Sequence, residues 1–575
     1  MVLEQRAPVA RVDDGDAHLF PEAGGLHQGA ELRRERGMRG RRLCAARAYR
    51  DRGDHEHGEG EGLRTSRSRH GAWLTTLGLV ASLFLGCGPG ADAPGSAEAP
   101  EDRLVVLLPA EPLEIDPRHV VDAQGLRVSR LIFRGLVTLD PDTLEVTPDL
   151  AESVRAEEGG LVYHVALRTG LTFTDGSALD AEDVRATYAS LVDPEVHSRF
   201  ADNYRRIERV EVVDEHHVDF VLRAPHAPFL TDLEMPIVRS EDAHAHLHLD
   251  DASLAGSGRY VRAAPSSRVI DLDGRADASG ALPARPRLRF VVIHDENTRA
   301  LRMLGGAGDV ALASISPLLV PMFESDERFV VRTADGTGTV YLGIETEHPW
   351  LSDVRVRRAL AMALDRVSLA DGKYEGLARV AESWIPEGHW AADPDAHVPA
   401  FDVAAARALL DEAGVPAGTR LTLRCASDRT RVSTANALAA MLAEVGLDVE
   451  VRPSETGILL ADLDAGRFDL ALMALPELFE PHTMARFFDS RSIPGEGGGA
   501  NRWRMRSSSL DAALDRGVAA LDREARRAAY AEVQQILARE LPVIPLVHER
   551  VTVVASRRAQ IERAPRDGRY AFLAR

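Results

Sequence analysis

Hydrophobic and polar positions follow two different periods along the chain, and the changes of period mark the expected strands and helices. A continuous hydrophobic run at residues 104–108 is closed by Pro109, which is typical of a short buried strand. Residues 128–137 follow with apolar positions at helical spacing. Strict alternation at residues 161–167 predicts a strand with one buried face. The first part of the body therefore mixes strands and helices.

The next elements form a compact α+β unit. Asp175 and Gly176 are typical of a tight turn, and residues 180–184 open a helix with acidic side chains in its first turn. Two further strands are expected at residues 210–213 and 218–222.

The second half of the chain alternates helices with strands, as in an α/β protein. A strand at residues 447–451 follows the last of three helices. Cys425 lies in the alternating run 421–425, where we expect a packed small side chain. The helices are expected at residues 355–363, 403–413 and 434–445, the last two ended by Gly414 and Gly446.

Length and charge narrow the class of protein. A chain of 575 residues is too long for one core, so we expect two or three lobes. The 69 Lys and Arg residues are outnumbered by 89 Asp and Glu residues, which gives a net charge of -20. Nucleic acid is therefore not an expected partner, because phosphate binding needs a cationic surface.

The segment at residues 64–86 has the pattern of an export signal. Arg64, Arg67 and Arg69 precede a short uncharged stretch that ends at Gly86 and Cys87. This ending resembles the lipobox of bacterial lipoproteins, which implies that Cys87 is acylated and becomes the new N-terminus. A plain secretory peptide or a membrane-anchoring helix is the alternative. Residues 87–102 have the composition of a flexible linker.

Residues 1–63 show no helical or strand periodicity. They lie upstream of the place where a signal peptide should begin, so we interpret them as a disordered extension or as the result of a start codon assigned too early. The remaining residues, 103–575, are expected to form the folded body.

The body contains a series of short motifs in a fixed order. The motifs include Ile115-Asp116-Pro117, Phe133-Arg134-Gly135-Leu136, Pro148-Asp149-Leu150-Ala151-Glu152-Ser153, Phe173-Thr174-Asp175-Gly176-Ser177, Gly256-Ser257-Gly258-Arg259-Tyr260, Asp353-Val354-Arg355-Val356-Arg357-Arg358-Ala359-Leu360 and Leu541-Pro542-Val543-Ile544-Pro545-Leu546. With these motifs in this order, the body resembles the family 5 extracytoplasmic solute-binding proteins, the peptide, dipeptide and nickel binders that serve ABC importers.

The resemblance implies an α/β fold of the periplasmic-binding-protein type, cluster C, with two large lobes, a hinge and a small third lobe. It places the base lobe at residues 103–140, 256–339 and 541–575. The small lobe would span residues 141–255 and the opposing lobe residues 340–540. Lobes that close on a ligand must both contact it.

The resemblance also implies a ligand site. In peptide-binding members an acid after a Trp-x-x sequence receives the ammonium group of the peptide, and Glu477 occupies that position here. Ala474 stands where the tryptophan would be, Leu475 follows it, and Pro476 has no N–H to give a ligand backbone. The alternative is that Glu477 is a solvated loop acid.

On the facing side, the resemblance implies that Val121, Asp122 and Ala123 lend backbone hydrogen bonds to the ligand. Trp503 is a candidate for the pocket wall, as are Trp384 and Trp390. For these tryptophans ordinary packing is an equally good interpretation.

The implied function is capture of peptides at the periplasm or cell surface by a monomeric lipoprotein, which delivers them to an ABC permease and its ATPase. A nickel or other small-solute binder of the same family, or a ligand-sensing surface lipoprotein without an importer, remains the alternative. His244, His246 and His248 alternate beside acids, but an exposed loop is the preferred interpretation, so no metal site is expected. We find no motif for a nucleophile, a P-loop or a metalloprotease, and therefore expect neither catalysis nor a cofactor.

Overall fold

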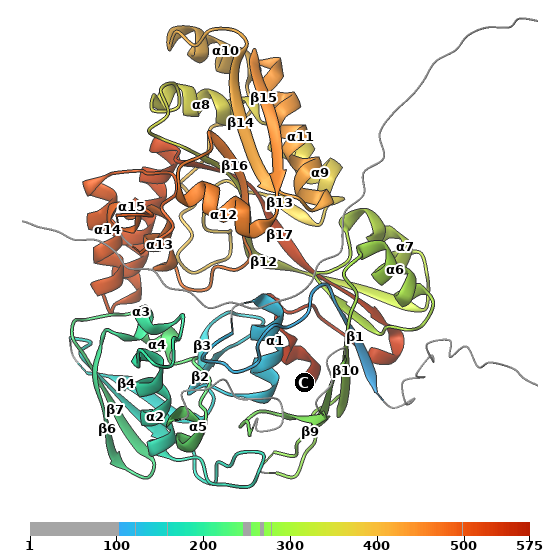
Figure 1. Cartoon of the computed structure of the whole chain (residues 1–575), viewed down its shortest axis with the longest axis vertical. Coiled ribbons are helices and arrows are strands. Elements are labelled where there is room, and N and C mark those ends of the chain that lie inside the picture. Colours follow the sequence, from blue (N-terminus) through green and yellow to red (C-terminus); the bar gives the residue numbers. More distant parts are fainter. Residues whose placement is uncertain are drawn as a thin grey trace, which may run out of the picture. The chain divides into compact units, whose positions relative to one another are not determined.

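The structure is a computed structural model, and it describes residues 103–120, 122–157, 159–244, 255–264, 269–277, 279–496 and 498–575. At its centre lies one long mixed sheet (Figure 1). Two long strands cross the middle of this sheet, β12 (Phe329–Ile344) and β17 (Val543–Ser556). We call them the hinge strands, because each continues from one half of the molecule into the other.

The remaining strands of the sheet lie on either side of the hinge strands. One side holds β13 (Ala378–Val380), β14 (Thr419–Ala426), β15 (Leu447–Ser454) and β16 (Leu470–Leu475). The other holds β1 (Leu104–Leu108), β8 (Tyr260–Ala264), β9 (Val269–Gly274), β10 (Arg287–Val292) and β11 (Val310–Leu312). Among the described residues the order is β15-β14-β16-β12-β17-β11-β1-β10-β9-β8, and β13 pairs with β17.

The hinge strands pair antiparallel from Phe329 opposite Ser556 to Gly343 opposite Val543. The register shifts between Asp335 and Thr339, close to the point where the strands pass between the two halves. A register shift bends a strand and interrupts its ladder of hydrogen bonds. This point is therefore the natural pivot between the halves.

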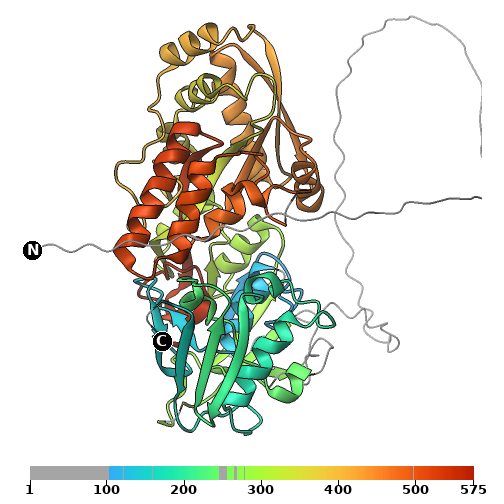
Figure 2. The same cartoon turned by 90° about the vertical axis from the view of Figure 1, so that its left-hand side faces the viewer.

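The opposing lobe is the upper half in Figures 1 and 2, and we define it as β13–β16 with the helices that cover them. Val340, Leu342 and Ile344 point from β12 into one of its cores, and Tyr341 points into the other. Both faces of the sheet are therefore covered, as parallel pairs such as β14 and β15 require. The helices are α8 (Val354–Ala363), α9 (Arg366–Tyr374), α10 (Val403–Glu412), α11 (Arg429–Glu444), α12 (Thr456–Asp464), α13 (Thr483–Phe488), α14 (Ser508–Ala519) and α15 (Arg523–Glu540).

The base lobe consists of β1 and β8–β11 with the helices α1 (Ala123–Ile132), α6 (Glu296–Leu304) and α7 (Val320–Glu324). The C-terminal segment completes its core, where Tyr570 packs edge-on against Phe290 with ring centroids 5.3 Å apart. The helix expected at residues 128–137 begins earlier and ends at Ile132. Asp122 caps it by accepting a hydrogen bond from the Gly125 N–H at 2.7 Å.

The small lobe is the lower left part of Figure 1 and has its own antiparallel sheet and core. Edge-on contacts between Tyr188, Phe220 and Phe229 fill that core, with centroids 4.8 and 5.4 Å apart. Its sheet has the order β4 (Ala151–Ala156), β5 (Val162–Leu167), β7 (His217–Leu222), β6 (Ile207–Asp214). Beside it lie α2 (Ala181–Val192), α3 (Ala201–Tyr204), α4 (Phe229–Asp232), α5 (Ser240–His244) and the pair β2 (Val137–Leu139) and β3 (Val146–Pro148).

Several predictions from the sequence pattern are confirmed. The strand expected at residues 104–108 is β1, and the alternation at residues 161–167 corresponds to β5. Gly414 and Gly446 follow α10 and α11 with φ of +73° and +89°, the left-handed conformation that ends a helix. Cys425 is a free, buried thiol. None of the helices in the described ranges is both long and apolar enough to cross a bilayer.

Candidate ligand-binding site

The loop that follows β16, residues 476–482, leaves the sheet where the lobes meet, and we call it the binding loop. Three neighbours hold it in place. The Leu478 N–H donates to Thr337 Oγ1 at 3.1 Å, and His389 Nε2 donates to the Phe479 carbonyl at 3.1 Å. A Cβ added at Gly338 would lie 2.7 Å from the Pro476 carbonyl oxygen, so this part of β12 must be glycine. The pivot thus fixes the loop directly.

Glu477 of the binding loop is half-buried. Within the described part of the chain its carboxylate forms no hydrogen bond or ion pair. It does act at a distance on Arg569: burial opposes the charge of that guanidinium, but Glu234 and Glu477 raise its pKa above the usual value. The carboxylate of Glu477 is therefore available to a cationic group of a ligand.

Below this loop, Glu234 joins two arginines of the base lobe. Arg130 Nη2 lies 2.9 Å from Glu234 Oε2, and the Arg569 guanidinium also pairs with Glu234. Burial alone would raise the pKa of Glu234, but the two arginines lower it. Arg569 reaches further: its guanidinium carbon lies 4.6 Å from the ring centroid of Phe479 in the opposing lobe.

The last residues of β16 offer an unpaired edge. Ala474 and Leu475 pair with Val340 and Thr339 of β12 on one side. On the other side the described pairing with β14 stops at Ala471. The free N–H and C=O groups of such an edge can accept an additional extended strand.

The segment predicted on the facing side lies at the start of α1. Asp122 uses both carboxylate oxygens for structure, since Oδ2 accepts from the Leu113 N–H at 3.0 Å while Oδ1 caps the helix. Ala123 is exposed. Val121 lies outside the described residues. At the start of α1, the described groups left for a ligand are therefore the backbone of Asp122 and Ala123 and the Ala123 side chain.

Trp503 does not line the cleft in this conformation. It is completely buried in the core of the opposing lobe, packed on Gly343 and edge-on to Tyr341 at 5.7 Å. Trp384 belongs to the same core. Trp390 is half-buried, with the Arg526 guanidinium carbon 4.9 Å from its ring centroid. The expectation of a tryptophan pocket wall is therefore corrected to core packing for Trp503 and Trp384.

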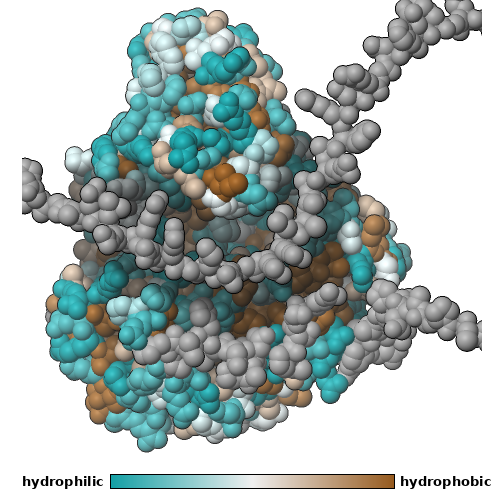
Figure 3. Space-filling view, viewed as in Figure 1, coloured by the Kyte–Doolittle hydropathy of each residue, from teal (hydrophilic) through white to brown (hydrophobic). Residues whose placement is uncertain are grey.

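The lobes are in direct contact in this structure. The Ala227 N–H of the small lobe donates to the Val518 carbonyl of the opposing lobe at 2.9 Å, and Thr231 Oγ1 lies 3.5 Å from Glu480 Oε2. Glu480 is buried and pairs with Arg526; burial raises its pKa, although Arg526 opposes this. The described conformation is therefore closed on this side. Figure 3 shows that the surface between the halves is hollowed and exposes hydrophobic groups.

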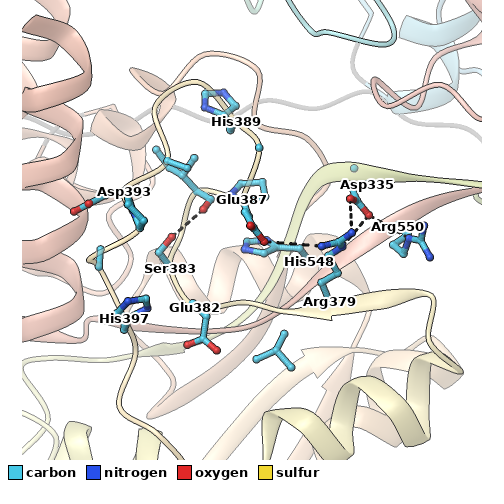
Figure 4. Close-up of a pocket in the computed structure, with 18 of the residues that line it drawn as sticks. Asp335, Arg379, Glu382, Ser383, Glu387, His389, Asp393, His397, His548 and Arg550 are labelled. Carbon is cyan, nitrogen blue, oxygen red and sulfur yellow. Dashed lines mark hydrogen bonds and ion pairs between the residues drawn. The ribbon is translucent and has the colours of Figure 1, made fainter. Parts of the chain in front are cut away.

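A cavity of about 740 Å³ adjoins the binding loop between the hinge strands and the segment at residues 382–397. His389 lines it, opposite a group in which Asp335 Oδ2 lies 2.8 Å from Arg379 Nη2 and Oδ1 lies 3.2 Å from Arg550 (Figure 4). Burial lowers the pKa of His548, also in its wall, to about 4. The volume is in the range of small-ligand pockets. Its members come from four distant segments, so no local sequence signal could have revealed it.

Comparison with known proteins identifies the family. Residues 145–492 match the family described as "Bacterial extracellular solute-binding proteins, family 5 Middle". The chain belongs to this family. Its α/β fold is accordingly that of the periplasmic binding proteins, as the motif series predicted.

Relatives within family 5 cover most of the chain. The sequence is 27% identical over 496 residues to di/tripeptide-binding protein 2 of Pseudomonas aeruginosa, covering 79% of this chain and 91% of the relative. The periplasmic binding protein DppA of Helicobacter pylori, solved with the peptide STSA, has a TM-score of 0.70 at 22% identity and covers 82% of this chain and 97% of its own. NikZ of Campylobacter jejuni, solved with Ni(L-His), has a TM-score of 0.73 at 23% identity and covers 82% and 98%.

Proposed function

We propose that this family 5 protein captures short peptides by lobe closure and delivers them to the permease and ATPase of an ABC importer. The observation that carries the proposal is the unpaired edge of β16 at Ala474 and Leu475, with the carboxylate of Glu477, which has no partner among the described residues, two positions further along the chain. An extended peptide can pair its backbone with this edge and place its ammonium group at Glu477.

The neighbourhood of Glu477 suits an ammonium group better than a second carboxylate. A buried cation needs a carboxylate partner, because an unpaired charge away from water is costly. Arg130 and Arg569 form their direct ion pairs with Glu234 and interact with Glu477 only at a distance, so the oxygens of Glu477 are left for a ligand cation. The small Ala474 leaves room for ligand side chains, and the exposed Pro476, which lacks an N–H, limits the pairing edge to the residues before it.

The names of relatives support a peptide ligand: the Pseudomonas relative is a di/tripeptide-binding protein and the Helicobacter DppA was solved with a tetrapeptide. The proposal further includes export and anchoring. Residues 64–86 would act as signal peptide and Cys87 would carry the lipid, which places the protein in the periplasm or at the cell surface as a monomer. All of these residues lie outside the described ranges.

The decisive experiment measures thermal stabilisation of the purified protein by di-, tri- and tetrapeptides, since a ligand that binds the folded state raises its stability. Glu477→Gln should weaken binding of a free-amine peptide by about 10- to 100-fold, because it removes a charge-assisted hydrogen bond. The N-acetylated form of the same peptide should bind wild type and variant equally. Glu450→Gln, which changes an exposed side chain of the edge strand β15, is the matched control.

A library that gives no shift with any peptide, alongside a shift with nickel or a sugar, would contradict the peptide ligand. The anchor is tested separately by labelling cells with radioactive palmitate: label on the wild-type protein and none on Cys87→Ala is the expected result. Equal labelling of both would show that Cys87 is not the lipid site.

A further inference from the structure

Three metal-binding side chains meet at the contact between the small lobe and the opposing lobe. His226 precedes α4 and Asp232 ends it, whereas His482 lies at the start of α13 in the other lobe. Their ligand atoms all lie within 4.8 Å of one another. The rings of His226 and His482 are perpendicular with centroids 5.4 Å apart, and His226 Nε2 lies 3.3 Å from Asp232 Oδ2.

The ligand atoms of this group are shielded from solvent. His482 Nδ1 is buried and forms no hydrogen bond with the described residues, and Asp232 Oδ2 is buried with His226 Nε2 at 3.3 Å as its neighbour. Buried polar atoms in folded proteins are nearly always satisfied, so ligand atoms that converge from two lobes point to a shared cation. Nothing in the proposed peptide site uses these atoms.

We propose that His226, Asp232 and His482 together bind one divalent transition-metal ion that ties the small lobe to the opposing lobe. Two imidazoles and one carboxylate are a ligand set that suits Zn²⁺, and it leaves one coordination position for water. Mg²⁺ and Ca²⁺ do not suit this site, because both ions prefer oxygen donors and two of the three ligands are imidazole nitrogens.

Two arginines surround the three ligands, and their charges limit the affinity. The guanidinium of Arg526 is already balanced by Glu480. Arg206 lies against the ring of His226 and also donates to the Asn203 carbonyl at 2.6 Å. Entry of a metal ion requires Arg206 to swing away from the ring, and its bond to Asn203 provides an alternative anchor.

Because ligands come from both lobes, metal binding must favour the closed state, as any ligand favours the conformation that supplies more of its contacts. Metal binding would thus stabilise closure without occupying the peptide edge at β16.

The test uses the full chain without an affinity tag, freed of metal with a chelator and titrated with ZnCl₂ by calorimetry. His226→Ala and His482→Ala should each lose one bound Zn²⁺ per chain or weaken that site by at least tenfold. Asp232→Asn, which keeps the shape of the side chain, should do the same. Small-angle scattering should show a Zn²⁺-dependent decrease in the radius of gyration for wild type only.

His217→Ala is the matched control, because His217 lies in the same lobe but is exposed and paired with Asp214. A variant with His244, His246 and His248 all replaced by alanine tests the other histidine run. Loss of Zn²⁺ only in that variant, or unchanged binding in His226→Ala and His482→Ala, would overturn the proposal. Should His482→Ala fail to fold, as judged by circular dichroism in chelator, His482→Gln takes its place.

Discussion

The guanidinium of Arg569 lies over the ring of Phe479, 4.6 Å from its centroid, and so connects the C-terminal segment of the base lobe with the binding loop of the opposing lobe. The same guanidinium pairs with Glu234 of the small lobe. One side chain therefore contacts all three lobes, and it can do so only when they are closed.

Replacing Phe479 by leucine should weaken closure while keeping the hydrophobic packing. A cation–π contact contributes about 0.5–1 kcal/mol, which corresponds to a roughly two- to fivefold loss of peptide affinity. Calorimetry with the peptide found by the thermal screen measures the affinity of both proteins. Phe401→Leu, an exposed phenylalanine of the same lobe, is the control. Equal affinity of Phe479→Leu and wild type would show that the contact does not contribute to closure.

Glu234→Gln should destabilise the fold strongly. It leaves Arg130 and Arg569 without their shared carboxylate, and removing one partner from a buried ion pair costs about 3 kcal/mol. Urea unfolding gives the value. Asp202→Asn removes an exposed pair with Arg205 and should cost less than about 1 kcal/mol. Similar losses for the two variants would contradict the role assigned to Glu234.

Two buried histidines should make stability fall in mild acid. Burial lowers the pKa values of His389 and His548 to about 4, whereas the unfolded chain takes up the same protons near pH 6.5. The unfolded state therefore binds more protons between these values, and stability falls as the pH is lowered from about 6.5 to about 4. Each histidine contributes on the order of 3 kcal/mol to this loss.

Because Glu480 and Asp567 have raised pKa values and act in the opposite direction, the effect is best isolated by difference. The slope of unfolding free energy against pH between pH 4 and 6.5 reports how many more protons the unfolded state binds than the folded state. His548→Gln should reduce that difference by up to one proton. His217→Gln, at an exposed site, should leave the slope unchanged. A slope that is the same in His548→Gln and wild type would show that His548 does not titrate as described.

Gly343→Ala should damage the core of the opposing lobe. An added Cβ would lie 1.9 Å from Trp503 Cζ3, so the indole must move, at a cost of about 3 kcal/mol. Gly372→Ala provides the contrast: it lies in α9 with no atom within 4 Å of its added Cβ, and should stabilise the helix by about 0.5–1 kcal/mol. Thermal unfolding measures the melting temperature of both variants. An unchanged melting temperature for Gly343→Ala would refute the close packing.

The sequence pattern predicted local structure well where the hydrophobic period and the residues that end an element agree. β1 and β5 follow from hydrophobic runs and alternation, and Gly414 and Gly446 mark helix ends because only glycine adopts their left-handed conformation without strain. The fold class was predicted from the series of motifs, and the family comparison confirms it. The boundaries of α1 were wrong because its cap, Asp122, lies before the apolar stretch that signals the helix.

The site could be predicted only in part. Glu477 could be predicted because it occupies the acid position of the family's Trp-x-x-acid sequence, and its role as a ligand group remains a prediction. The sequence left two interpretations of Trp503, a pocket wall and ordinary packing, because an aromatic residue looks the same in either place, and in this structure Trp503 is buried. Contacts such as Arg569 with Phe479, or His226 with His482, join segments far apart in sequence, and no local period encodes them.

The pairing of strand β17 has a consequence for how the chain folds. It lies near the C-terminus, yet it pairs with β11 in the base lobe and with β12 and β13 toward the opposing lobe. Neither the base lobe nor the opposing lobe can complete its part of the sheet until β17 has paired. The two halves of the sheet therefore reach their native pairing together, and neither is expected to fold to completion as a separate fragment.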